Sequence, residues 1–190
     1  KTSVITALEM AEGAHKRDGA LAGVTSGLVD VDTMLGGLHP SDLLILAGRP
    51  SMGKTALATN IAFNAAYTHH QSGGEQGAVV GFFSLEMSAE QLAARILSEQ
   101  SNVSSDRMRK GELTNEEFSR LAQASNALHE VPIFIDDTPA LTVSALRTRA
   151  RRLKRQNDLG LIVVDYLQLI SGSAKSRSDG RVQEVSEITR

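Results

Sequence analysis

The sequence predicts an α/β fold in which a mostly parallel sheet is covered by helices on both faces. Short apolar runs, typical of strands buried on both faces, alternate along the chain with longer segments of helical periodicity. This alternation favours right-handed crossovers and places ligands at the carboxyl ends of the strands. The expected strands are Leu43 to Ala47, Ala78 to Phe83, Val131 to Ile135 and Leu161 to Val164.

Four longer helices are expected between and around these strands. Two of them begin with a capping box, in which a Ser or Thr is followed three residues later by Gln or Glu. Ser88 with Gln91 is the first such pair, and Thr114 with Glu117 is the second. The four helices are expected from Lys54 to about His70, from Ser88 to about Glu99, from Thr114, and from Thr142 to about Arg155.

Composition limits the possible function classes. A chain of 190 residues with 41% hydrophobic content is long enough for one domain with a buried sheet. The absence of Cys excludes disulfides and thiolate metal sites, and cytoplasm is the expected location. No apolar stretch approaches the roughly 20 residues of a membrane helix, so membrane insertion is not expected. A net charge of −2 leaves any nucleic-acid binding to local basic loops.

The segment from Gly48 to Thr55 matches the phosphate-loop pattern G-x-x-x-x-G-K-[ST] in full, between an expected strand and an expected helix. Its glycines let backbone N–H groups face phosphate oxygens, and the following helix adds its positive end. Lys54 is expected to reach the β and γ phosphates in catalysis, and Thr55 to hold Mg²⁺ with its hydroxyl. The expected nucleotide-binding residues are Gly48, Arg49, Pro50, Ser51, Met52, Gly53, Lys54 and Thr55.

Asp165 is the second expected metal ligand. It follows the apolar strand Leu161 to Val164, and phosphate-loop enzymes need a carboxylate at the end of such a strand to hold the metal ion. The alternative is a strand-end Asp that caps the next turn. Tyr166 follows it, at a position where many nucleoside triphosphatases carry a catalytic Glu, so the carboxylate that activates water must come from elsewhere.

Glu86 is the best candidate for that catalytic base. It lies just beyond the strand Ala78 to Phe83, at the sheet edge where the nucleotide is expected. The alternative is an acidic residue placed near the start of the helix that Ser88 opens, where negative charge is stabilising.

Three motifs in order resemble the motor domain of bacterial DnaB-type replicative helicases: Gly-Arg-Pro-Ser-Met-Gly-Lys-Thr, Phe-Ser-Leu-Glu-Met-Ser and Val-Asp-Tyr-Leu-Gln-Leu. Thr25-Ser26-Gly27 and Leu35-Gly36-Gly37-Leu38 also match the family's pattern. The resemblance implies a RecA-like P-loop NTPase core that uses ATP and Mg²⁺, with Glu86 as the catalytic base. It further implies homo-hexameric rings, ATP sites at subunit boundaries, and 5′ to 3′ translocation on single-stranded DNA during replication.

The resemblance also divides the chain. Residues 1–23 are expected to form a linker helix, from Ser3 to about Lys16, and a connector. The apolar stripe of this helix is expected to dock on a neighbouring subunit, and packing on its own domain is the alternative. Residues 24–190 are expected to form the RecA-like ATPase domain, incomplete at its carboxyl-terminal side. The family's Ser-Gln strand, second DNA loop and Arg finger have no counterpart in the sequence, nor does the domain that recruits primase and the helicase loader. Weak or absent hydrolysis is therefore expected of this chain alone.

Contact with DNA is expected, at most, from the polar segment Ser171 to Gly180, which carries Lys175 and Arg177. A solvated surface loop with incidental charge is the alternative. The Arg-rich face of the helix from Thr142 is interpreted as a solvated face, and Asp136 with Asp137 as turn residues.

Other functions remain open at this point. A recombinase-like DNA-dependent ATPase has the same fold, and a small-molecule kinase uses the same phosphate loop. A nucleotide switch without hydrolysis is a third alternative, and Glu86 argues against it.

Overall fold

The computed structural model describes residues 21–49 and 51–166. The expected linker helix at Ser3 to Lys16, Pro50, and the segment with Lys175 and Arg177 lie outside these residues. The described elements are α2 (Val29–Leu35), α3 (Lys54–Gln71), β1 (Val79–Ser84), α4 (Ala89–Ser101), α5 (Ser105–Lys110), α6 (Asn115–His129), β2 (Ile133–Asp136), α7 (Val143–Asn157) and β3 (Leu159–Asp165).

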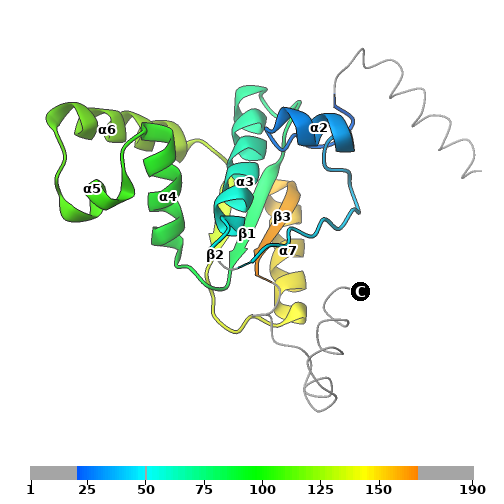
Figure 1. Cartoon of the computed structure of the whole chain (residues 1–190). Coiled ribbons are helices and arrows are strands. Elements are labelled where there is room, and N and C mark those ends of the chain that lie inside the picture. Colours follow the sequence, from blue (N-terminus) through cyan, green and yellow to red (C-terminus); the bar gives the residue numbers. More distant parts are fainter. Residues whose placement is uncertain (1–20, 50, 167–190) are drawn as a thin grey trace, which may run out of the picture.

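The three described strands form one parallel sheet with β1 in the centre, in the order β2-β1-β3 (Figure 1). Phe83 of β1 pairs with Asp136 of β2, and Ser84 pairs with Asp165 of β3. The carboxyl ends of all three strands therefore meet at one edge of the sheet. The predicted parallel sheet is confirmed, with strand boundaries shifted by one or two residues.

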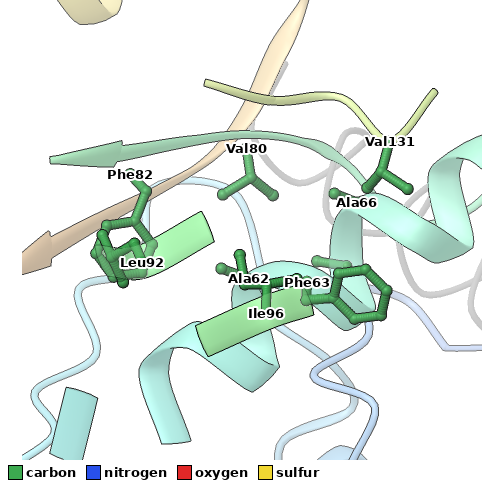
Figure 2. Packing of buried hydrophobic residues seen from close by; sticks show 9 residues of the cluster. Ala62, Phe63, Ala66, Val80, Phe82, Leu92, Ile96 and Val131 are labelled. Atoms are coloured by element: carbon green, nitrogen blue, oxygen red, sulfur yellow. The ribbon is translucent and has the colours of Figure 1, made fainter. Parts of the chain in front are cut away.

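One face of the sheet is covered by α3 and α4. Val80 and Phe82 of β1 point toward this side and pack with Ala62 of α3 and Leu92 of α4 (Figure 2). Both strand residues are at most 2% exposed. Because side chains alternate along a strand, residues two apart belong to the same layer.

The opposite face is covered by α7. Phe83, one residue after Phe82, packs there with Ala150 of α7, Leu159 of β3 and Leu141 from the preceding turn. Helices therefore cover both faces, as the sequence predicts, and β1 is buried along its whole length.

The helix starts agree with the capping signals. The side chains of Ser88 and Thr114 each accept the backbone N–H of the residue three positions on. The side chains of Gln91 and Glu117 in turn accept the backbone N–H of Ser88 and Thr114, so both capping boxes are formed. Thr142 likewise caps α7. The six-residue α5 was not predicted, because such a short helix shows no apolar periodicity. In the part of the chain that the structure describes, no helix has the length and apolar character needed to cross a membrane.

The prediction of a buried strand at Leu43 to Ala47 is wrong for the structure as described. The segment has no strand geometry, and Leu43 and Ile45 are 63% and 66% exposed. An apolar run becomes a buried strand only when a neighbouring strand pairs with it and helices cover it. Within residues 21–49 and 51–166, β3 pairs with β1 alone, and no strand pairs with the run. The periodicity identified apolar residues but could not identify their partners.

A buried polar cluster around Asp32 of α2 connects the segment before α2 to α3. Thr25 and Ser26 donate their hydroxyls to the two Asp32 oxygens at 2.5 and 2.7 Å, and the Ser26 N–H donates at 2.8 Å. Asn64 of α3 donates to the Ser26 carbonyl at 3.2 Å. Burial raises the pKa of Asp32, but the donors from Ser26 and Thr25 outweigh it and hold that pKa below its usual value.

Replacing Asp32 by Asn should lower the free energy of unfolding at pH 7 by about 2–3 kcal/mol, because an amide leaves part of the donor cluster unsatisfied. The depressed pKa makes the carboxylate stabilising above its unfolded-state value of about 3.9, and this contribution is lost as pH falls through the folded-state value. The difference between the two proteins in denaturant titrations should therefore shrink below about pH 4. Asp30→Asn, on the exposed side of the same helix, is the matched control and should change the free energy by less than about 0.5 kcal/mol. Equal effects of the two variants would contradict the stabilising role of the cluster.

Candidate nucleotide-binding site

The phosphate loop ends in an uncapped helix start. Gly53, the residue before α3, has a φ of 83°, in the left-handed region that favours glycine. Ser51 also has a positive φ, of 64°, which is uncommon for a residue with a side chain. No side chain caps the first N–H groups of α3, which leaves these donors and the helix dipole for an anion.

A cleft of about 560 Å³ lies along this loop. Its size is in the range of small-molecule sites. The walls combine apolar side chains from the approach to the loop with the loop itself and the first turn of α3. The lining residues are Leu46, Ala47, Gly48, Arg49, Met52, Gly53, Lys54 and Leu57.

Lys54, the first residue of α3, connects this loop to the end of β3. Its Nζ atom lies 5.6 Å from the centroid of the Tyr166 ring, a distance at which a cation interacts favourably with an aromatic face. Tyr166 directly follows Asp165. The fold thus brings the phosphate loop and the expected metal carboxylate together across 110 residues of sequence.

Asp165 carries a buried acceptor without a partner. The residue is 7% exposed, and its Oδ2 atom has no hydrogen-bond donor among the described residues. A buried acceptor left unpaired is destabilising by about 1–3 kcal/mol, and more when it is charged. Such groups commonly lie at functional sites, where a cation or ligand completes the contacts.

The donor set fits Mg²⁺. A carboxylate at Asp165 and a hydroxyl at Thr55 are hard oxygen ligands of the kind this ion prefers. Within the described part of the chain, no group of three or more His, Cys, Asp or Glu residues could form an all-protein metal site. Mg²⁺ normally needs no such site, because one or two protein ligands and substrate phosphates hold it.

The backbone next to Glu86 is hydrogen-bonded to the backbone of Asp165. The N–H of Leu85 donates to the carbonyl oxygen of Asp165 at 2.8 Å, directly after the pairing of Ser84 with Asp165. The Ser84 hydroxyl donates to the Met87 carbonyl at 2.6 Å and closes the turn around Glu86. The Glu86 side chain is exposed at this turn, so it is open to water at the sheet edge.

Asp136 has the structural role that the sequence indicates. Its carboxylate accepts the Thr138 N–H at 3.1 Å, which is a turn contact, and also binds Arg149 of α7 at 2.5 Å. Burial raises the pKa of Asp136, but Arg149 and Thr138 outweigh it and hold that pKa below its usual value. The other basic residues of α7 are exposed, in agreement with a solvated face.

Asp137 makes a contact that sequence reasoning missed. Its Oδ2 accepts the N–H of Ala89, the first residue of α4, at 2.9 Å. The two residues are 48 positions apart, and no local pattern predicts such a pairing. The contact joins the end of β2 to the helix that follows Glu86.

Comparison with known proteins gives a consistent result. Residues 23–190 match the family model described as "DnaB-like helicase C terminal domain". The chain is 52% identical over 180 residues to the replicative DNA helicase DnaB of Rickettsia bellii, which covers 93% of this chain and 36% of that protein. It is 44% identical over 190 residues to the DnaB of Geobacillus stearothermophilus, covering 100% of this chain and 40% of that protein. The chain thus spans less than half the length of these relatives.

Two solved structures have the same fold. The structure named "ATPase Domain of G40P" superposes with a TM-score of 0.87 at 26% identity, covering 97% of this chain and 63% of that one. A DnaB-like replicative helicase, described together with its interactions with primase, superposes with a TM-score of 0.85 at 27% identity. That match covers 100% of this chain and 43% of the other.

Replacing Asp165 by Asn should stabilise the chain in buffer free of divalent cations, because the variant no longer buries an unpaired negative charge. We expect the free energy of unfolding to rise by about 1–2 kcal/mol in denaturant titrations. Asp158→Asn, at the C-cap of α7 directly before the same strand, is the matched control. Its side chain forms an exposed ion pair with Lys154, and its loss should change stability by less than about 0.5 kcal/mol. A destabilised Asp165→Asn protein would contradict the unpaired state of Oδ2.

Proposed function

Because the chain belongs to the DnaB-like helicase C-terminal domain family, we propose that it is the ATP-hydrolysing motor of a replicative DNA helicase. The observation that carries this proposal is the meeting of three features at one edge of the sheet. These are the uncapped start of α3 at Lys54, the unpaired carboxylate of Asp165 and the turn that bears Glu86.

The phosphate loop supplies two kinds of contact in this proposal. The backbone N–H groups of its non-proline residues bind the phosphate oxygens, and Lys54 places its ammonium on the β and γ phosphates. Thr55 and Asp165 are the residues that would hold Mg²⁺. When bound, this ion neutralises charge on the phosphate oxygens as the terminal bond breaks.

Glu86 is the proposed general base. It takes a proton from water as the water oxygen bonds to the γ-phosphorus, and the bond from that phosphorus to the β–γ bridging oxygen breaks. ADP and inorganic phosphate are the products. Exposure of the Glu86 side chain gives water access to it, and the Leu85 bond to Asp165 keeps it near the proposed metal ligand.

The proposal extends to the longer proteins of this family. A homo-hexameric ring, movement along single-stranded DNA, cytoplasmic location, and contacts with primase and a loader are proposed for a full-length protein that contains this chain. Lys175 and Arg177 are the proposed DNA contacts. The family match favours this function over a recombinase-like ATPase or a small-molecule kinase.

Replacing Lys54 by Ala should weaken binding of Mg-ATP at least tenfold, because the variant loses the ammonium that is proposed to contact the β and γ phosphates. Titration with a fluorescent ATP analogue measures the Kd. Lys110→Ala removes an equal charge from an exposed ion pair of α5 and should leave the Kd unchanged. Unaltered affinity in the Lys54 variant would refute the assignment of the loop.

Replacing Glu86 by Gln should leave the Kd for Mg-ATP within about twofold and lower the hydrolysis rate by about 10²–10⁴, the usual contribution of a general base. The rate is measured as phosphate release by the full-length protein in the presence of single-stranded DNA. Glu90→Gln, on the exposed first turn of α4, controls for loss of a nearby charge. Loss of binding in step with turnover would remove Glu86 from the role of base.

A further inference from the structure

We propose that Asp137 is a positioning residue for Glu86, acting through its hydrogen bond to the start of α4. This inference rests on the proposed role of Glu86 as the base. It concerns how the base is held in place, and it assigns a task to a carboxylate that does not itself touch the substrate.

Glu86 lies on the short connection between β1 and α4, and a hydrogen bond to another element fixes each end of this connection. At the strand end, Leu85 is bonded to the Asp165 carbonyl at 2.8 Å, next to the last residue of β1. At the helix end, the Ala89 N–H is bonded to Asp137 Oδ2 at 2.9 Å. Only Met87 and Ser88 separate Glu86 from Ala89, so a displacement of the helix start displaces Glu86 as well.

The Asp137 bond satisfies a donor that the capping box leaves open. At the start of α4, the Ser88 side chain accepts from Gln91, and the Ser88 N–H donates to the Gln91 side chain. Ala89 is the first helical residue, and its N–H has no acceptor within the helix. Asp137 supplies this acceptor from a different strand, so it fixes α4 relative to the sheet. A cap within the helix cannot do that.

Asp137 is itself held by its neighbour Asp136. Asp136 pairs with Phe83 in the sheet, and its carboxylate is bound by Arg149 and by the Thr138 N–H. Arg149 also donates to the Thr138 hydroxyl at 2.6 Å. The turn after β2 is therefore anchored to β1 and to α7, which makes Asp137 a fixed point against which α4 is placed.

This arrangement predicts a specific kinetic effect. A general base works only within hydrogen-bond reach of the proton it takes, and a shift of about 1 Å costs up to about a hundredfold in rate. The Asp137 bond ends on α4 and not on the phosphate loop. Its loss should therefore lower kcat and leave nucleotide affinity unchanged.

The test uses the full-length natural protein that contains this chain, with DNA-stimulated ATP hydrolysis as the readout. Asp137→Ala should lower kcat tenfold or more, with the Kd for Mg-ATP within twofold of wild type. Asp137→Asn keeps an oxygen acceptor and should recover most of kcat. Asp137→Glu keeps the charge but moves the acceptor outward, and should lower kcat although it folds. Glu90→Ala removes an acidic side chain from the same helix turn and should leave kcat unchanged.

The outcomes separate this inference from the proposed function. If Glu86→Gln abolishes turnover while both Asp137→Ala and Asp137→Glu keep full kcat, the inference is overturned and the role of Glu86 stands. If Glu86→Gln keeps full turnover, the proposed base is wrong. A parallel loss of nucleotide affinity in Asp137→Glu would indicate a general structural role and also overturn the inference. Should Asp137→Ala fail to fold, the comparison of Asp137→Glu with Asp137→Asn decides.

Discussion

The site depends on the parallel pairing of β1 with β3, and above all on its register at the carboxyl end. Ser84 lies opposite Asp165 because one residue is skipped between Val79 and Val80, at Gly160. Without this bulge, Asp165 would lie opposite Leu85, and the carbonyl that receives the Leu85 N–H would be displaced along the strand. A glycine is required there, because an added Cβ would come within 2.9 Å of the Ala78 side chain.

The apolar core and the polar site use the same strand in different ways. Val80 and Phe82 bind β1 to α3 and α4, whereas Phe83 binds it to α7. The strand that leads to Glu86 is therefore fixed from both faces over its whole length. A rigid support of this kind allows an unfavourable feature, the unpaired Asp165 oxygen, to persist beside the end of the strand.

Features with local causes were predictable from the sequence, and features with distant causes were not. The phosphate loop, the capping boxes at Ser88 and Thr114, and the strand before Asp165 each follow from residues within a few positions. The bond from Ala89 to Asp137 joins two loops through the sheet, so it becomes visible only once the strand order is known. The error at Leu43 to Ala47 has the same origin, since an apolar run carries no information about the strand that must pair with it.

The identity of residue 166 explains why the proposed base lies on another strand. Tyr166 presents a neutral ring to Lys54, whose Nζ lies 5.6 Å from the ring centroid. Tyr166 leaves no carboxylate directly after Asp165 to act as a base, so the proposed base has to come from another element of the fold. In the proposed site, the turn after β1 supplies the base. The Leu85 N–H joins this turn to the Asp165 carbonyl, and the Ala89 N–H joins the start of α4 to Asp137.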